Sequence, residues 1–279
     1  MKSRSPCPNR TVIFSLSALC AGLMSNAHGG LLPSRGTLVS QLGSAAVTEN
    51  FESFLFPTNT AKRVGAAVDA TSVIDGQGPG LVVQGVRFLE SPRGEGLQWD
   101  RQFEYGLLSA ALCSETRLII DFTTPVSHAG FDMFWFTVPH VILDPSTVQV
   151  FAADDVSMLY TTNFVEPTAP NSVFFGFEEN NGIGRIVLFR LDIEGFDPGP
   201  LIDNLTFGFV PSLSIGLSGE QFTISWPQVA TDYQLEATVH LGIQASWTAV
   251  TNSPAPLNGQ NTVTLSPEES SKFFRLRSQ

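Results

Sequence analysis

The hydrophobic pattern of this chain is typical of short β-strands. Apolar runs rich in β-branched and aromatic residues are separated by clusters of Gly, Pro, Asn and Asp, and helical spacing of apolar positions is scarce. Many short strands at this spacing favour a sandwich or barrel, and the 22 Phe residues suit a thick apolar interior between two sheets. The expected strands before residue 211 lie at 80–90, 116–122, 128–138, 146–153, 157–165, 171–177, 184–193 and 201–209.

A second pattern of tighter strands begins after Pro211. Phe222, Ile224 and Trp226 alternate with polar residues, as expected for a strand with one buried face. We therefore predict that residues 213–279 form a small immunoglobulin-like or fibronectin-III-like sandwich, with Trp226 in its core.

The first 27 residues have the three parts of a secretory signal peptide. Lys2, Arg4 and Arg10 form a positive region, 11–24 is an apolar run too short to anchor in a bilayer, and 25–27 is a small-x-small cleavage site. The alternative is a buried N-terminal helix. Because the three parts come in the order of a signal peptide, we expect the protein to be exported and cleaved after Ala27.

Cleavage changes the charge and the cysteine content. The removed segment carries three basic residues and no acidic ones, so the formal net charge moves from −11 to −14. An acidic chain repels nucleic acid and anionic lipid, and it is compatible with divalent cations and neutral sugars. Only Cys113 remains, and no later apolar run is long enough for a transmembrane helix. We expect a secreted or cell-surface protein without a transmembrane anchor or nucleic-acid partner.

The second unit carries a recurring set of short motifs. These are a Trp-Pro strand end at 226–227, a Tyr-x-Leu-Glu-Ala strand at 233–237, a Trp-Thr pair at 247–248 and a final Phe-Phe-Arg-Leu at 273–276. In this set the unit resembles a C-terminal module of many secreted bacterial proteins. The resemblance implies an accessory or attachment domain, and no catalytic residue belongs to the pattern.

The first unit carries three motifs of its own: Phe51-Glu52, the segment 122–131 and the closing Ile-Asp-Asn-Leu-Thr-Phe at 202–207. In these motifs the unit resembles the jelly-roll domains of exported bacterial surface proteins. The hydrophobic sorting tail that often accompanies such domains is missing. We therefore expect an all-β chain with a linker at 28–47, a jelly-roll sandwich at 48–210 and the fibronectin-III-like unit at 213–279.

Asp203 and Asn204 lie in the middle of an expected strand, although both residue types are depleted in strands. The first and last strands of a jelly roll are commonly neighbours, so Glu52 and Asp203 are expected to face one another, with Asp197 and Asp192 just upstream. Paired carboxylates repel, and calcium would compensate by taking their oxygens. The alternative is that Asp203 faces solvent or caps backbone N–H groups at a bulge, with Asn204 turned outward.

A second candidate site is a sugar-binding surface within 94–106. Trp99 and Tyr105 lie in a polar, Gly-rich stretch where exposed rings would stack on a pyranose face, and Arg101 and Asp100 would supply hydrogen bonds. The alternative is that both rings cover the edge of the core.

Motifs for catalysis are poor. The sequence has no Gly-x-Ser-x-Gly elbow, no His-Glu-x-x-His and no phosphate loop, and its four His residues lack paired ligand spacing. We expect a non-catalytic binding or adhesion protein with a glycan or cell-surface polymer as its partner. The alternatives are a polysaccharide-acting enzyme with an accessory module, and a structural component of an envelope or matrix.

Overall fold

The computed structural model describes residues 29–91, 96–103, 107–114, 117–134, 145–165, 167–190, 201–218, 221–242, 245–266 and 272–279. These residues form antiparallel sheets, with one short α-helix, and the prediction of an all-β chain is confirmed. The folded part consists of two compact units, Gly29–Val210 and Pro211–Gln279.

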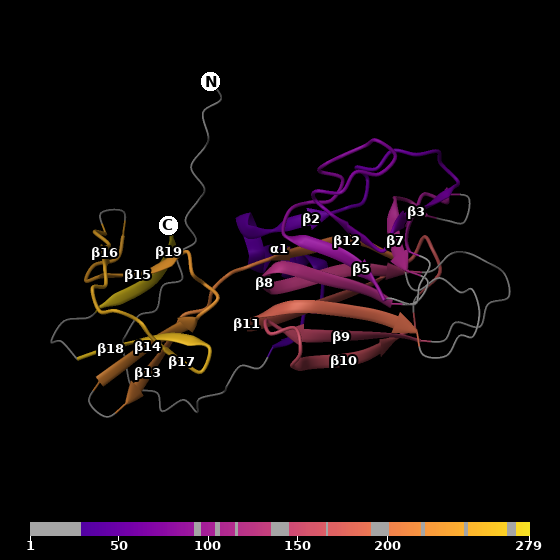
Figure 1. Cartoon of the computed structure of the whole chain (residues 1–279). Helices are drawn as coiled ribbons and strands as arrows, with labels where there is room; N and C mark the ends of the chain where they lie inside the picture. The colour runs from indigo at the N-terminus through magenta and orange to yellow at the C-terminus, as the bar shows by residue number, and fades with distance from the viewer. Residues whose placement is uncertain are drawn as a thin grey trace, which may run out of the picture. The chain divides into compact units, whose positions relative to one another are not determined.

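Two long strands form the frame of the unit Gly29–Val210 (Figure 1). Strands β8 (Arg117–Phe134) and β11 (Val173–Arg190) pair antiparallel from Val173 opposite Met133 to Phe189 opposite Arg117. The pairing is interrupted where residues 179–182 of β11 lie opposite only one residue of β8. A bulge of this kind bends and twists the strands that carry it.

The bent strands give the unit a sandwich-like architecture of two layers. In one half of the β8–β11 pair, β9 and β10 extend the sheet beyond β11, and β5 and β4 extend it beyond β8. In the other half, β1 pairs with β11 and β12 pairs with β8. From β12 the sheet continues through β7 and β6 to β3. The bounds of these strands are β1 (Gly30–Leu31), β3 (Ala61–Gly65), β4 (Ala67–Asp69), β5 (Val86–Glu90), β6 (Leu97–Asp100), β7 (Ala111–Ser114), β9 (Ser146–Ala152), β10 (Met158–Phe164) and β12 (Leu201–Gly208).

An aromatic cluster lies at the centre of this core. Phe51 packs against Phe88 with ring centroids 5.3 Å apart and against Trp99 at 5.7 Å. Phe131 and Phe175, from the paired long strands, contact each other at 5.3 Å. All five side chains are almost completely buried, in agreement with the large area that aromatic rings remove from water.

The segment predicted to be a linker, 28–47, instead belongs largely to this unit. From residue 29 onward it pairs with or packs on the sheet, because it contains two edge strands and two short helices. These elements are β1, α1 (Arg35–Leu42), η1 (Gly43–Ala45) and β2 (Val47–Glu49).

Helix α1 is short but well defined. The Ser34 side chain caps it by accepting a hydrogen bond from the Thr37 N–H at 3.1 Å. Leu38 and Leu42, four residues apart on one face, are both fully buried. The helix is therefore held by its packing on the sheet, since a helix of this length is marginal in isolation.

The two ends of the unit pair with each other, but not through the residues that we predicted. Strand β12 pairs with β2, with Leu205 opposite Glu49 and Phe207 opposite Val47. Glu52 follows in a turn, which begins at Phe51 with a positive φ of 56°. The strand β2, which precedes the Phe51-Glu52 motif, therefore covers the edge of β12, and the motif itself does not.

The unit Pro211–Gln279 has two small sheets. Ile224, Trp226, Leu235, Val263 and Phe274 form the centre of its buried apolar residues. Strand order is β13-β14-β18-β17 in one sheet and β16-β15-β19 in the other, with bounds β13 (Ser214–Ser218), β14 (Gln221–Pro227), β15 (Tyr233–Thr238), β16 (Thr248–Ala249), β17 (Ala255–Leu257), β18 (Gln260–Leu265) and β19 (Phe273–Ser278).

Three of the four recurring motifs of this second unit meet around Glu236. Glu236 lies opposite Arg275 across the β15–β19 pair, and its carboxylate accepts bonds from Arg275 at 2.6 Å and Arg277 at 3.2 Å. The Arg275 guanidinium lies 4.3 Å from the centre of the Trp247 ring. The Leu-Glu-Ala, Trp-Thr and Phe-Phe-Arg-Leu motifs therefore have a structural basis, a buried ion pair covered by an aromatic ring.

No helix in the described ranges is long and apolar enough to cross a membrane.

Candidate functional site

The Asp-Asn pair of β12 forms a bulge in the middle of the strand. The register between β12 and β8 shifts between Asp203 and Thr206, and Asn204 has a φ of 53°. Asn is one of the few residues other than Gly that tolerate this left-handed conformation. The Asp203 carboxylate accepts a hydrogen bond from the Asn204 N–H at 2.6 Å. The two residues that are poor strand-formers are therefore suited to the one position where the ladder is broken.

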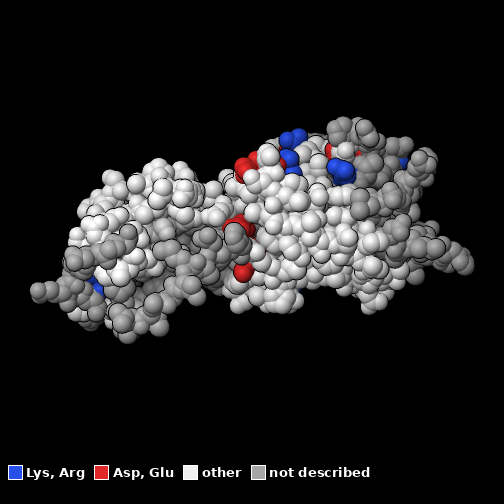
Figure 2. All heavy atoms as spheres, turned by 90° about the horizontal axis from the view of Figure 1, so that it is seen from below, with Lys and Arg blue, Asp and Glu red and all other residues white. Residues whose placement is uncertain are grey.

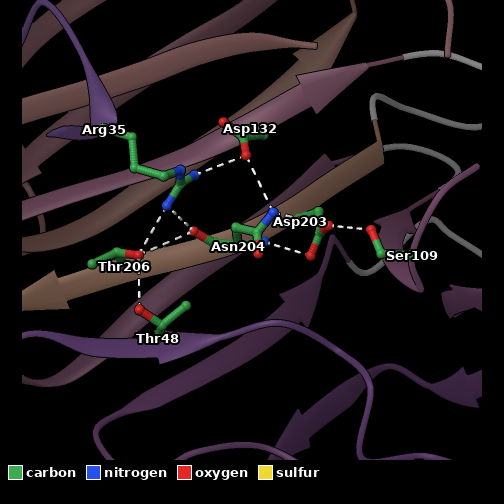
Figure 3. A network of polar contacts seen from close by, with 7 residues as sticks. All are labelled: Arg35, Thr48, Ser109, Asp132, Asp203, Asn204 and Thr206. Carbon is green, nitrogen blue, oxygen red and sulfur yellow. Dashed lines mark hydrogen bonds and ion pairs between the residues drawn. The ribbon is translucent and has the colours of Figure 1, made fainter. Parts of the chain in front are cut away.

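Asp203 and Asn204 point into a polar network (Figure 3). The Ser109 hydroxyl donates to Asp203 Oδ2, and the Asn204 side-chain amide donates to the same oxygen at 3.0 Å. The Asn204 amide also lies 3.2 Å from Asp132 Oδ2. The Asn204 side chain is thus directed inward, and the expectation that it turns outward is wrong.

Arg35 connects this network to helix α1 (Figure 3). One of its guanidinium nitrogens donates to the Asn204 carbonyl at 2.7 Å and to the Thr206 hydroxyl at 2.9 Å, and another lies 3.0 Å from Asp132 Oδ2. Thr206 in turn bonds to Thr48 of β2 at 2.9 Å. We did not predict Arg35, because it lies in the segment assigned to a linker and nothing in its neighbours indicates a partner 169 residues away.

Burial dominates the electrostatics of the network. Asp203 is only 3% exposed, and this loss of solvent raises the pKa of its carboxyl to about 6. The hydrogen bonds from Ser109 and Asn204 oppose the rise in pKa, whereas the negative charges of Asp132 and Glu52 add to it. A carboxyl in this setting takes up a proton near neutral pH.

The carboxylates proposed as calcium ligands approach the same short segment. The Ala110 N–H donates to Glu52 Oε1 at 2.7 Å, and the adjacent Ser109 donates to Asp203. Asp197, the third expected ligand, and Asp192 lie outside the described residues. Within the residues that the structure places, no group of three or more His, Cys, Asp or Glu side chains is arranged to hold a metal. Protein donors therefore already occupy part of the coordination capacity of both carboxylates.

Trp99 requires a correction. Its side chain is fully buried, its ring packs edge-on against Phe51 and Phe54, and its Nε1–H donates to the Phe51 carbonyl at 2.7 Å. A ring with both faces covered by protein cannot stack on a sugar. Trp99 is a core residue, as the alternative interpretation held.

Arg101, by contrast, lies at the surface of the unit. It is half-buried, and its guanidinium lies 5.6 Å from the ring centres of both Phe56 and Phe103 while donating to the Phe56 carbonyl at 2.7 Å. Its Nε is buried and has no hydrogen-bond partner in the part of the chain that the structure describes. Tyr105, the other predicted ring, lies outside that part.

Two further carboxylates are buried. Glu49 was missed by sequence reasoning, whereas Asp100 was expected to hydrogen-bond a sugar, and this expectation is wrong because its side chain is fully buried. Glu49 accepts hydrogen bonds from the backbone N–H groups of Phe51 at 2.6 Å and Val83 at 2.8 Å, and Asp100 accepts one from Gln102 at 2.8 Å. Burial raises the pKa of both acids. Their role is to hold turns against the sheet, and a single sequence gives no signal that separates such acids from solvated ones.

Comparison with known proteins finds no family model that matches this chain, and no curated protein that matches it.

Proposed function

We propose that this chain is an exported, non-catalytic binding protein whose ligand is an oxygen-rich polymer such as a glycan. In this proposal the first unit is a jelly-roll domain that carries the ligand surface, and the second is a fibronectin-III-like accessory module. The observation that supports the proposal is the arrangement of Arg101 between two aromatic rings at the surface.

Arg101 is suited to such a ligand by its geometry. A guanidinium has five N–H donors in a fixed plane, and hydroxyl and carbonyl oxygens of a polysaccharide are acceptors for them. The contacts with Phe56 and Phe103 fix the plane of the group, so that less side-chain entropy is lost on binding. Half-exposed Phe rings beside a fixed donor also offer apolar surface for a sugar face.

The distribution of charge favours a ligand of low charge. On the face seen in Figure 2, charged side chains of the described residues are few and lie singly or in small groups. The chain as a whole is acidic, with a formal net charge of −11. A polyanion such as nucleic acid would be repelled, whereas a neutral polysaccharide would not.

A glycan-array screen of the exported chain tests the proposal. We expect binding to neutral or weakly charged polysaccharides, and loss of at least about tenfold in affinity for Arg101→Gln, the cost of one or two lost hydrogen bonds. Arg87→Gln is the matched control. Arg87 is exposed on β5, and its substitution removes the same positive charge as Arg101→Gln. Equal binding by both variants, or no binding by the wild type to any glycan, would refute the proposal.

A structural calcium ion at Glu52, Asp203 and Asp197 remains part of this proposal. The support is the approach of the first two carboxylates to residues 109–110, together with the negative charge of Glu52, which adds a small part to the rise in the Asp203 pKa that burial mainly causes. Melting curves with excess calcium and then with chelator test it, since a bound ion stabilises the folded state by mass action. An unchanged melting temperature would exclude the ion, and a shift that survives Asp203→Ala would place it elsewhere.

A further inference from the structure

The backbone of Gly29 contacts a buried carboxylate. The Gly29 N–H donates to Glu179 Oε2 at 2.9 Å, and Glu179 is only 5% exposed. Its other oxygen accepts the Asn181 N–H at 2.9 Å. Glu179 lies in the bulge of β11, beside the residues that pair with β1.

The fit of Gly29 to this position is close. A Cβ atom at Gly29 would overlap the Glu178 carbonyl oxygen and come within 2.7 Å of Glu179 Oε2. The following residues continue the docking, since Gly30 and Leu31 pair with β11 and the Leu32 N–H donates to the Gly176 carbonyl at 2.8 Å. Gly29 thus starts a segment that is held against the sheet by backbone contacts.

The charge at this position is not balanced by a basic side chain. In the described ranges Glu179 makes no ion pair, and its partners are the two backbone N–H groups. The adjacent Glu178 carboxylate accepts from Gln41 and lies 3.6 Å from His128 Nε2. Burial lowers the pKa of His128, although the Glu178 charge opposes this, so that the imidazole is neutral at pH 7. Glu179 is thus a buried carboxylate without a basic partner among the described residues.

We propose that Glu179 is the docking site for the amino terminus created by signal-peptide removal, an inference that rests on the proposed export. Cleavage after Ala27 gives a chain beginning His28-Gly29, with an α-ammonium group on the residue before the Gly29 N–H. Three covalent bonds (N–Cα, Cα–C and C–N) join the nitrogen atoms of adjacent residues and keep them about 3 to 4 Å apart. The new positive charge is therefore within reach of the Glu179 carboxylate, which accepts the Gly29 N–H at 2.9 Å and for which an opposite charge is a strong local stabiliser.

This arrangement distinguishes Glu179 from another buried acid of the unit. Glu90 is 7% exposed and also accepts a backbone hydrogen bond, from Gly96, but its partners lie inside the chain, far in sequence from any predicted cleavage point. Glu179 alone among the described buried acids receives its bond from the residue that adjoins the predicted new terminus. Glu90 therefore supplies a matched control.

The test measures the basicity of the amino terminus of the processed full chain. Terminal sequencing first establishes that the exported protein begins at His28. Competitive acylation at neutral pH then gives the reactivity of the α-amine in wild type, Glu179→Gln and Glu90→Gln. An adjacent carboxylate raises the pKa of an amine by about one unit or more, so we expect the α-amine of Glu179→Gln to react about tenfold faster than that of wild type. Glu90→Gln should react like wild type.

Acetylation of the terminus provides a second readout. It removes the positive charge, and we expect it to lower the melting temperature of wild type but not of Glu179→Gln. Equal acylation rates in all three proteins, or an equal effect of acetylation on both, would overturn the docking proposal while leaving export intact. A terminus other than His28 in an exported protein would instead overturn the predicted cleavage site, and an uncleaved Met1 terminus would overturn the proposed export.

Discussion

Asp203 makes the stability of the first unit depend on pH in a direction opposite to that of most carboxylates. Its folded pKa of about 6 lies above the ordinary value of 3.8, so the folded state binds the proton more tightly than the unfolded state does. The stability that this proton contributes is fully present below the unfolded pKa and is lost as the pH rises through about 6. The unit should therefore gain stability from this group on mild acidification.

The magnitude follows from the difference between the two pKa values. A shift of this size corresponds to about 3 kcal/mol between the fully protonated and fully ionised limits, at 1.36 kcal/mol per unit. Glu49 and Asp100, whose pKa values are also raised by burial, act in the same direction. Their contribution is removed by comparing wild type with Asp203→Asn, because it is common to both proteins.

Urea unfolding across about pH 4 to 8 measures the effect. The buried thiol of Cys113 lies in this unit, so a brief pulse of a thiol reagent that reacts at acid pH reports its unfolding separately from the second unit. Asp203→Asn should lose about 2.4 kcal/mol of the wild-type pH dependence over this range, because pH 4 lies close to the unfolded pKa and the lower limit is not fully reached. Asp75→Asn is the control, because the Asp75 side chain is half exposed and its φ of 51° suits Asn. Identical pH profiles for wild type and Asp203→Asn would refute the reasoning from burial.

Two further substitutions test the packing of the two units. Leu38→Ala should destabilise the first unit by about 3 kcal/mol in urea unfolding, because it leaves a cavity under helix α1, whereas Val39→Ala at a largely exposed position should have little effect. Glu236→Gln should lower the stability of the second unit by about 2 kcal/mol, because it leaves Arg275 without its charge partner. Unfolding followed by Trp fluorescence measures this change. A loss below about 0.5 kcal/mol would show that the ion pair is effectively solvated.

The sequence was informative where a short apolar run ends in turn residues or alternates with polar positions. The run at 201–209 contains β12, only the last part of the run at 80–90 is a strand, β5, and the alternation in 222–226 correctly placed Trp226 in the core. Helix α1 gave no comparable signal, because only Leu38 and Leu42 of its eight residues are buried. A helix that short depends on the sheet beneath it, and the sheet is assembled from distant segments.

The candidate site was predicted only in part for a related reason. The presence of Asp and Asn inside a strand correctly marked residues 203–204 as unusual, but the partners Arg35, Ser109 and Asp132 come from three other places in the chain. Trp99 was misjudged because polar neighbours in sequence suggested exposure. Its exposure is set instead by Phe51 and Phe54, which cover it in the folded unit.

The pairing of the first elements of this unit with its last strand bears on when the fold can form. The bond from Arg35 to the Asn204 carbonyl spans 169 residues, and β2 meets its partner only in β12. Contacts of such long range make folding slow, because the entropy of closing the loop is lost before the contacts form. A chain still missing its closing strand has an open sheet edge and remains without its native structure. This topology delays commitment to the native state until nearly the whole domain has been synthesised, and in the export that we propose it would keep the chain unfolded until then.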